Sequence, residues 1–577
     1  MINEEVAELL EELADMEEIE GNRWESIAYR KAAGSIRSLS IDLEQLYREN
    51  KLREIDGVGQ AIEKKIIQYI TTGSIEKYLE LKRKYPLDFR NLRRIQGLGP
   101  KKIYALYRSL GVRELTDLRE ALEKHSIASV PGFGAKSEAN IASELRRLES
   151  LSTERVPLAR IFDYATGIRD KLISSGKFRV VELVGSFRRM RDTVGDLDIL
   201  AVSDDPASGY GAFLGLDEIT GIIVKGESKV SVTLDAGVNC DFRIFNEESF
   251  GAAMQYFTGS KQHNIRLRDL AIDNGMKLNE YGLFKGETRV AGRTEEEVYT
   301  NLGMQWVPPE LRENMGEIEL ALAGRLPSLV NEVACDMHIN IPAGSSAEFM
   351  EQLASGLGSG NVKGGAFLLS ADKNEPAKQS GHVNKEDMEK FLEAAYLLSP
   401  QIRENILIGA QLDLLSIAEN RYPADLLARF DYIVGSASAL SNDDIKSNTD
   451  LYLKAIETRL IDAIAHPTGR IIGKIPPAPI DFSRLFTACR ENGVWLEING
   501  FPERSDLPAD IVRRGKDAGV KFVIGSGATS YTELRYIKFA VYIARRGWLV
   551  PEDVAGSGTI GSVRAALMKR KTLKPIK

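Results

Sequence analysis

Hydrophobic and polar residues follow different periods in different parts of this chain. Over residues 1–150, apolar positions recur at helical spacing and short glycine turns separate the segments. From about residue 151, short apolar β runs alternate with helical stretches. Over roughly 330–575 the alternation is regular, with apolar strands such as FLLS, YIVGS and KFVIGS, as in a parallel barrel. The pattern predicts an all-α region, an α+β region and then a distorted α/β barrel.

One turn pattern recurs three times in the helical region. Each copy has an apolar residue, a glycine–apolar–glycine turn and a helix: IDGVGQAIEKKI (55–66), IQGLGPKKIYAL (95–106) and VPGFGAKSEANI (130–141). Glycine permits the tight turn, and backbone N–H groups at the next helix start can bind a phosphate. Three copies favour helix-hairpin-helix binding of the DNA backbone over ordinary turns. The candidate DNA-binding residues are Gly57, Gly59, Gly97, Gly99, Lys101 and Lys102.

The stretch GSFRRMRDTVGDLDIL (185–200) lies between two predicted β runs, 180–187 and 196–202. Residues i and i+2 of a strand point to the same face, so Asp196 and Asp198 would stand side by side. A second pattern, 229–245, predicts a hairpin whose second arm carries Asp241. Three acids on one sheet can converge on Mg²⁺, a hard cation that prefers oxygen ligands. The alternative is a polar turn followed by structural aspartates.

Residues 256–268, YFTGSKQHNIRLR, form the next dense motif. The pattern predicts a helix that begins with a small-residue cap and carries Asn264 and Arg268 on one face. Pro308-Pro309 and AGRLPS (323–328) indicate the end of a domain.

Composition narrows the possibilities further. A chain of 577 residues, 43% apolar and 28% charged, is long enough for three or four domains. No secretion signal or membrane span is readable. Three separated cysteines suit a reducing cytoplasm and argue against a disulfide or zinc framework. The net charge of −7 does not indicate nucleic-acid binding, but residues 81–110 carry nine Lys/Arg and one acid, and local patches decide such binding.

These motifs together resemble family X DNA polymerases over residues 1–320, and over the whole chain the bacterial and archaeal members with an appended PHP domain. The resemblance is carried, in the family's order, by AYRKAA (28–33), the GVG and GLG turns, GSFRR…GDLDIL, the strand of Asp241, and YFTGS with the following Asn and Arg. It implies a lyase-like helical domain (1–82), a helix-hairpin-helix DNA-binding domain (83–150), a nucleotidyltransferase palm (151–245), a nucleotide-selection subdomain (246–320) and a PHP-like domain (330–577).

The resemblance also assigns roles to single residues. It implies that Asp196, Asp198 and Asp241 hold two Mg²⁺ ions, for which Mn²⁺ can substitute, with Asp241 nearest the primer 3′-hydroxyl. It implies a monovalent cation at the hairpin turns. Asn239 departs from relatives that carry a basic residue there. The implied nucleotide-binding residues are Arg155, Gly185, Ser186, Arg189, Gly195, Tyr256, Phe257, Gly259, Asn264 and Arg268, the last two as minor-groove contacts.

The resulting hypothesis is template-directed, gap-filling repair synthesis. The expected partners are gapped or primed DNA and dNTPs, and we expect a cytoplasmic, nucleoid-associated monomer without membrane contact. One alternative is another nucleotidyltransferase, because GS…DxD is shared across that superfamily; the hairpins and YFTGS argue against it. A second is a non-catalytic DNA-binding scaffold, against which the intact acid triad argues. A third is a polymerase whose C-terminal half keeps 3′–5′ exonuclease or phosphoesterase activity.

A lyase activity is a further hypothesis drawn from the resemblance. In relatives, a lysine after the first hairpin attacks the sugar aldehyde of an abasic site and forms a Schiff base. Lys65 occupies the matching position, and Tyr29 also matches. Ala61 stands where a supporting lysine is expected, and Lys65 as a plain phosphate contact is the alternative.

The C-terminal half departs from the metal-binding pattern of PHP domains. The usual His-x-His is His338-Ile339-Asn340, the Thr-Asp-His position is SADK (370–373), and an expected Glu is Gln411. A histidine is lost around Ser438, and the final Gly-Ser-Asp-x-His has become residues 525–529, GSGAT. His338 and His466 survive, while Glu497 reads as strand scaffold. We therefore expect a folded barrel without a functioning metal cluster.

Overall fold

The computed structural model of the chain describes residues 2–37, 43–72, 74–93, 95, 97–151, 155–226, 229–358, 362–370, 383–437, 440–441 and 444–573. The chain divides into two compact units, residues 1–153 with 314–316, and residues 154–313 with 317–577. The candidate residues at 371–373 and Ser438 lie outside the described residues. In the described part of the chain, no helix is long and apolar enough to cross a membrane.

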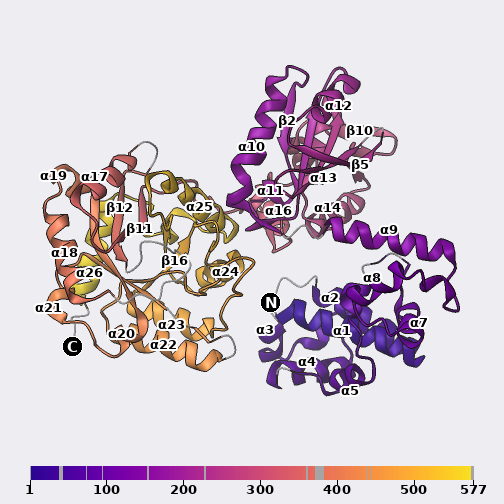
Figure 1. Cartoon of the computed structure of the whole chain (residues 1–577), viewed down its shortest axis with the longest axis horizontal. Helices are drawn as coiled ribbons and strands as arrows, with labels where there is room; N and C mark the ends of the chain where they lie inside the picture. The colour runs from indigo at the N-terminus through magenta and orange to yellow at the C-terminus, as the bar shows by residue number, and fades with distance from the viewer. Residues whose placement is uncertain are drawn as a thin grey trace. The chain divides into compact units, whose positions relative to one another are not determined.

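The first unit is all-α, as the helical periodicity predicts (Figure 1). Its core joins apolar faces of every long helix, including Leu10, Ile66 and Leu106. Its helices are α1 (Ile2–Glu20), α2 (Arg23–Arg37), α3 (Leu43–Arg48), α4 (Gln60–Thr72), α5 (Glu76–Lys84), α6 (Phe89–Leu92), α7 (Pro100–Leu110), α8 (Leu115–Glu123) and α9 (Ala135–Leu151).

All three predicted hairpin turns form. Gly57, Gly97 and Gly132, the first glycine of each copy, have φ of +81°, +91° and +88°, which disfavours any residue with a Cβ. Helices α4, α7 and α9 begin within three residues of these turns. The three-fold repeat in the sequence is therefore a repeat of one backbone conformation.

The second unit begins with a five-stranded sheet, which we call the palm sheet. Its strand order is β2-β4-β7-β6-β5, with β4 and β7 parallel and the other pairs antiparallel. Its elements are α10 (Leu158–Ser174), β2 (Val180–Leu183), α11 (Gly185–Arg188), β4 (Asp196–Val202), α12 (Pro206–Leu214), β5 (Ile219–Lys225), β6 (Val230–Leu234) and β7 (Asn239–Phe245). The short pair β1 (Val156–Pro157) and β3 (Thr193–Val194) lies beside it.

The strand predicted over 180–187 is too long. It ends at Leu183, because Gly185 has φ +66° and turns the chain into α11. The predicted strand 196–202 and hairpin 229–245 are confirmed as β4 and as β6 with β7.

A helical region with a small sheet follows. It contains α13 (Phe250–Thr258), α14 (Lys261–Asp273), β8 (Lys277–Asn279), β9 (Gly282–Lys285), β10 (Thr288–Ala291), α15 (Glu295–Asn301) and α16 (Glu317–Leu322). The predicted cap is confirmed: Ser260 precedes α14 and its hydroxyl accepts a hydrogen bond from the backbone N–H of His263.

The C-terminal part is a parallel seven-stranded sheet with strands in sequential order, β11 to β17. A parallel bridge between Ile339 of β11 and Ala528 brings its two edges together, so the sheet is a nearly closed barrel. The strands are β11 (Cys335–Pro342), β12 (Gly364–Ser370), β13 (Ile406–Asp413), β14 (Tyr432–Ser436), β15 (Ala463–Ile464), β16 (Trp495–Asn499) and β17 (Phe522–Gly525).

Helices lie around the barrel strands in Figure 1. Their apolar residues share one core with those of the strands, and this confirms the predicted barrel. The longer ones are α17 (Ala347–Gly356), α18 (Lys385–Tyr396), α22 (Ile445–Glu457), α23 (Phe482–Asn492), α24 (Ala509–Asp517), α25 (Ile537–Arg546) and α26 (Ile560–Leu573), and the shorter ones are α19 (Pro400–Asn405), α20 (Leu414–Ala418) and α21 (Ala424–Leu427).

Candidate functional site

The palm sheet brings the three predicted aspartates onto one face. Strands β4 and β7 run parallel with Asp198 directly opposite Asp241, and Asp196 lies two residues before Asp198 on the same face. Burial raises the pKa of Asp198 to about 7, and repulsion from Asp196 and Asp241 adds to this rise. Burial and Asp241 also raise the pKa of Asp196. Ionising all three neighbouring carboxylates costs free energy unless a positive group lies close to them.

Lys229 supplies one positive charge to this cluster. Its Nζ lies 2.5 Å from Oδ2 of Asp241, while the hydroxyl of Ser231 donates to Oδ1 of Asp241 over 2.6 Å. Both residues belong to the β6 arm of the hairpin, at the point where it pairs with β7. The predicted hairpin, with its turn at residues 235–237, places Ser231 opposite Asp241, whereas the sequence gives no signal for the contact of Lys229.

The donor set suits a hard divalent cation, since carboxylate oxygens are the ligands that Mg²⁺ prefers. In this conformation the three aspartates are not arranged around a common metal position. Across the described ranges, no three His, Cys, Asp or Glu side chains are placed to hold one metal ion. Lys229 instead occupies one oxygen of Asp241. An entering cation would relieve the repulsion that raises the pKa of Asp198.

Gly185 is fixed by its contact with this cluster. A Cβ at this position would lie 2.3 Å from Oδ2 of Asp198, and its φ of +66° also favours glycine. The glycine that ends β2 therefore makes room for a carboxylate of β4. This explains why a glycine stands at the junction of β2 and α11 in this chain.

Three further candidate residues lie in or beside the segment from α11 to β4. Arg155 donates to the hydroxyl (2.9 Å) and the carbonyl (2.6 Å) of Thr193. Its guanidinium lies over Gly195, where a Cβ would be 3.2 Å from Nη1. Ser186 is half-buried in α11. Arg155 and Gly195 thus lie together, and Gly195 directly precedes Asp196.

The YFTGS segment is tied to the same turn. Arg189 donates to the carbonyl of Thr258 and to Glu313, and its Nη1 would lie 3.1 Å from a Cβ on Gly259. Tyr256 and Phe257 are half-buried and their rings meet edge to face, with centroids 5.1 Å apart. The structure therefore brings Arg189 and Gly259 together from segments 70 residues apart.

The last two nucleotide candidates differ in their surroundings. Asn264 is already engaged, because its amide donates to the carbonyl of Tyr256 (2.6 Å) and accepts from Gln255 (2.7 Å). Arg268, one turn later on α14, is exposed. The two share a face of the helix, as predicted, but only Arg268 presents an exposed side chain.

A buried charge network that the sequence does not reveal supports this region. Glu295 accepts hydrogen bonds from Arg188 (2.7 and 2.8 Å) and from Arg312 (2.6 Å), which is fully buried. Burial alone would raise the pKa of Glu295, but the two arginines outweigh it and hold the pKa well below its ordinary value. Arg188, one of the predicted Arg pair, is thus committed to a structural role that fixes α11 against α15.

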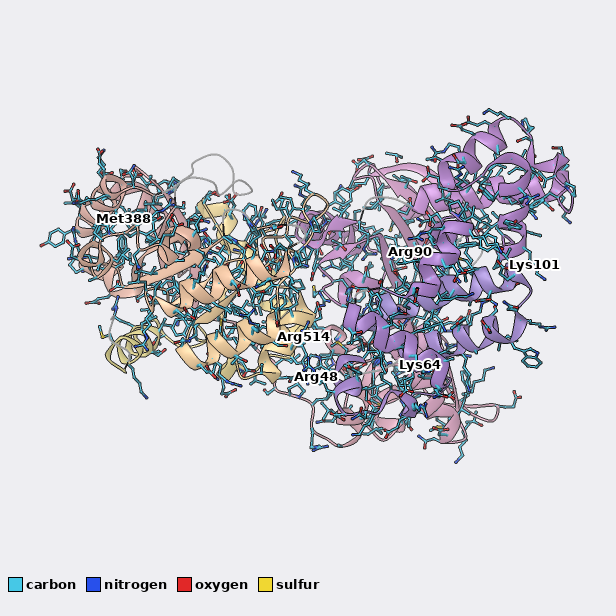
Figure 2. The ribbon with its side chains drawn as sticks, turned by 90° about the horizontal axis from the view of Figure 1, so that it is seen from below. Arg48, Lys64, Arg90, Lys101, Met388 and Arg514 are labelled. Atoms are coloured by element: carbon cyan, nitrogen blue, oxygen red, sulfur yellow. The ribbon has the colours of Figure 1, made fainter. Side chains whose placement is uncertain are left out.

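The hairpin unit offers a second candidate surface. Lys101 and Lys102, at the start of α7, are exposed and form no ion pair with any residue that the structure describes; Lys101 is labelled in Figure 2. Gly59 and Gly99 have open space where a Cβ would stand. A phosphate could therefore approach both turns closely.

Part of the basic run at 81–110 is neutralised within the first unit. Four of its nine basic residues pair with acids of the first helix α1, so the local excess of positive charge is smaller than the sequence alone indicates. The pairs are Lys82–Glu12, Lys84–Glu20, Arg90–Glu8 and Arg93 with Glu11 and Asp15.

The candidate lyase residue lies beside its expected partner. Nζ of Lys65 is 5.5 Å from the ring centre of Tyr29 and 3.5 Å from the carbonyl of Ala61. Burial raises the pKa of Tyr29, so the phenol is neutral. The position is compatible with the hypothesis, which stays untested.

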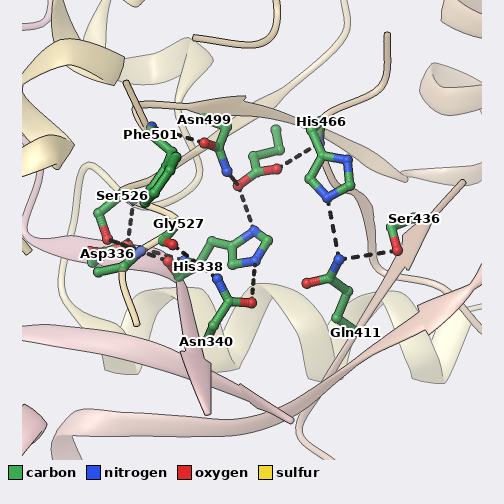
Figure 3. A network of polar contacts seen from close by, with 12 residues as sticks. Asp336, His338, Asn340, Gln411, Ser436, His466, Asn499, Phe501, Ser526 and Gly527 are labelled. Carbon is green, nitrogen blue, oxygen red and sulfur yellow. Dashed lines mark hydrogen bonds and ion pairs between the residues drawn. The ribbon is translucent and has the colours of Figure 1, made fainter. Parts of the chain in front are cut away.

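In the barrel, the surviving histidines belong to a closed polar network (Figure 3). Nδ1 of His338 lies 2.7 Å from Glu497, and its Nε2 lies 3.2 Å from Oδ1 of Asn340. The ion pair with Glu497 outweighs burial and raises the pKa of His338. Acceptors beside both ring nitrogens favour the doubly protonated form of His338, in which neither nitrogen has a lone pair to offer to a metal.

The second histidine is engaged as well. Nε2 of His466 accepts from the amide of Gln411 over 3.3 Å, and burial lowers its pKa well below the ordinary value, so it is neutral. Glu497, interpreted from the sequence as strand scaffold, lies at the centre of the network: it also accepts from Asn499 (2.9 Å) and from the backbone of His466 (2.7 Å).

Comparisons with known proteins agree with this architecture. Family models match for a helix-hairpin-helix domain (residues 1–75), a SAM-like helix-hairpin-helix tandem (89–147) and the DNA polymerase beta thumb (253–313). The chain is 30% identical to the DNA polymerase/3′-5′ exonuclease PolX of Bacillus subtilis (strain 168), over 99% of this chain and 100% of that protein. It is 25% identical to DNA polymerase lambda of Rattus norvegicus and 24% identical to that of Arabidopsis thaliana, each over 54% of this chain, covering 56% and 62% of those proteins.

Proposed function

The chain belongs to the family X DNA polymerases, nucleotidyltransferases that act on DNA and nucleotides, and from this premise we propose that it performs gap-filling repair synthesis with its palm sheet as the reaction centre. The observation that carries the proposal is the register of β4 and β7, which sets Asp198 opposite Asp241 with Asp196 on the same face. Asp196, Asp198 and Asp241 would hold two Mg²⁺ ions. When bound, Mg²⁺ activates the primer hydroxyl and neutralises charge on the transferred phosphate.

The surrounding residues would bind and orient the nucleotide. Arg155 and Arg189 present planar donor sets that suit phosphate oxygens, and both already fix the backbone at Thr193 and Thr258. Ser186, Gly185 and Gly195 would let the phosphates approach the turn. Tyr256, Phe257 and Gly259 would contact the sugar, and Arg268 would reach the minor groove. Ser231 would orient Asp241, which would accept the proton of the primer hydroxyl.

Primer extension on gapped DNA tests this function. We expect template-directed addition that requires Mg²⁺ and is more efficient on short gaps than on long templates, because the helical DNA-binding unit is small. The variant Asp241→Ala should lose addition while its DNA affinity stays close to that of the wild type. Robust synthesis by Asp241→Ala would refute the assignment of the site.

We propose in addition that the barrel has no metal-dependent phosphoesterase or exonuclease activity. The support is the network in Figure 3, in which Asn340 and Gln411 engage the ring nitrogens of His338 and His466. Metal analysis of the purified chain should find no stoichiometric Zn or Mn in the C-terminal half. Mn²⁺-dependent 3′ exonuclease activity that disappears in His338→Ala or His466→Ala would contradict this proposal.

A further inference from the structure

The C-terminal barrel is joined to the palm sheet through the hydrophobic core. Phe539 of α25 is 4% exposed and belongs to the core of the palm sheet. Its ring centre lies 5.5 Å from that of Phe162 on α10, and Phe162 stacks on Phe187 of α11 at 5.3 Å. Helix α25 of the barrel is therefore linked to α11 through the ring of Phe162. Helix α11 precedes residues 189–195, which lead to Asp196.

Two arginines of the barrel hold one acid of that turn. Asp192 follows α11, and its two carboxylate oxygens bind different partners: Oδ1 accepts from Arg546 of α25 over 2.6 Å, and Oδ2 accepts from Arg470 over 2.7 Å. Arg470 also donates to the carbonyls of Arg504 and Ser505 in the barrel. The arginine side chains are 8% and 11% exposed, so water replaces these bonds poorly.

The charges of this cluster depend on one another. Burial would raise the pKa of Asp192, but Arg546 and Arg470 outweigh it and keep the carboxyl ionised. Conversely, burial lowers the pKa of Arg546 and Asp192 opposes this change. Removing one partner would leave a buried charge without compensation, a situation that a protein avoids by moving the backbone or admitting water.

Asp192 is connected through the backbone to β1, to β3 and to the start of β4. Its carbonyl accepts from the backbone of Leu158 over 2.9 Å, and Thr193, the next residue, pairs with Pro157 in β1–β3. Thr193 holds Arg155 through its hydroxyl and its carbonyl. Asp196 begins β4 only three residues after Thr193. A shift at Asp192 therefore moves both the phosphate-binding arginine and the first metal-binding carboxylate.

We propose that the barrel positions the polymerase site, with Arg470 and Arg546 as positioning residues that act through Asp192 on residues 193–196. This role rests on the proposed function, because it presumes that Asp196 and Arg155 belong to the reaction centre. It gives the barrel a function that needs none of the missing metal ligands. It also predicts that the two parts of the unit are coupled in catalysis and not only in folding.

Single-turnover nucleotide insertion by the full chain tests the proposal. Arg546→Gln and Asp192→Asn should each lower the maximal insertion rate by roughly ten- to a hundred-fold, the effect of displacing a reacting group by about 1 Å. Gapped-DNA affinity should stay unchanged. The double variant should be no slower than the slower single variant, because both changes break one interaction. Unchanged rates in the single variants, or losses that multiply in the double variant, would overturn the proposal.

Two controls separate positioning from general damage. Arg160→Gln removes an exposed ion pair between α10 and Glu503 of the barrel that does not reach the turn, and its rate should stay within about twofold of wild type. Leu427→Ala opens a cavity in the barrel core and should lower the melting temperature without slowing insertion. A slowing by Leu427→Ala equal to that of Arg546→Gln would assign the effect to stability and refute positioning.

Milder variants keep the test decisive if Arg546→Gln does not fold. Arg546→Lys and Arg470→Lys keep the charge but lose the planar donor set, so a slowed insertion at unchanged DNA affinity is expected, and wild-type rates in both would overturn the proposal. Asp241→Ala separates a failure of the proposed function from a failure of the positioning role alone. If that variant still synthesises DNA, the proposed function is wrong; if it is inactive while the arginine variants are normal, only the positioning role is wrong.

Discussion

Gly185→Ala offers the sharpest test of the geometry of the palm site. The new Cβ would lie 2.3 Å from Oδ2 of Asp198. An ordinary contact is about 3.5 Å, so either the Asp198 carboxylate or the turn must move by about 1 Å. A misplacement of that size at a reacting centre costs roughly a hundred-fold in rate. The φ of +66° adds about 1–2 kcal/mol of backbone strain for any residue with a Cβ.

Gly176→Ala is the matched control for this substitution. Gly176 follows α10 with φ +68°, and nothing lies within 4 Å of its hypothetical Cβ. The two variants therefore share the backbone strain, and only Gly185→Ala carries the collision with Asp198. We expect both to lower the free energy of unfolding by at least about 1 kcal/mol, and only Gly185→Ala to lose synthesis.

The assay combines thermal unfolding with single-turnover insertion on gapped DNA. Wild-type insertion by Gly185→Ala would show that the position of Asp198 does not limit the reaction. An equal loss of rate in Gly176→Ala would show that backbone strain, and not the collision, causes the effect. Either result would refute the reasoning that connects Gly185 to the acid cluster.

Three further predictions concern lysines. Lys229→Met removes the ammonium group that pairs with Asp241, so the affinity of the free protein for Mn²⁺ should rise by about tenfold, or about 1.4 kcal/mol. Electron paramagnetic resonance measures this affinity, and Lys225→Met, at an exposed position, is the control. An unchanged affinity in Lys229→Met would show that Lys229 does not compete with the metal ion. Lys101→Ala with Lys102→Ala should reduce the slope of log affinity against log salt by about 0.9 for each DNA phosphate that the protein no longer neutralises, whereas Lys124→Ala, which removes an exposed ion pair with Glu120, should not. The lyase hypothesis predicts that borohydride traps an abasic-site adduct with wild type and with Lys64→Ala but not with Lys65→Ala, and the absence of any adduct with wild type would end it.

Local features of the fold could be predicted from the sequence because short-range physics determines them. The glycine turns require positive φ at Gly57, Gly97 and Gly132, and the sequence places glycine at each. The period of two residues sets Asp196 and Asp198 on one face, and the parallel register then adds Asp241. The predicted strand 180–187 was wrong at its end because apolar alternation continues past Leu183 while the backbone of Gly185 turns away.

Partners far apart in the sequence could not be predicted. Arg188 and Glu295 are 107 residues apart, and Arg470 and Arg546 are 278 and 354 residues from Asp192. A charged residue carries no local sign of which opposite charge it will meet. The basic run at 81–110 shows the same limit, because its neutralisation depends on how helix α1 packs and not on its own composition. The domain boundaries inside each unit stay predictions.

The acidic cluster of the palm sheet and the polar cluster around Glu497 in the barrel differ in how their charge is balanced, and this difference favours different functions for them. In the palm sheet, burial together with repulsion from Asp196 and Asp241 raises the pKa of Asp198 to about 7, although Lys229 pairs with Asp241. In the barrel, Glu497 already contacts the ring of His338 and accepts from an amide and a backbone N–H. A divalent cation would stabilise the first cluster, whereas in the second it would have to displace His338. We therefore propose that Arg470 and Arg546, which bind Asp192 beside the palm sheet, and His338, which binds Glu497 in the barrel, serve structure rather than metal chemistry.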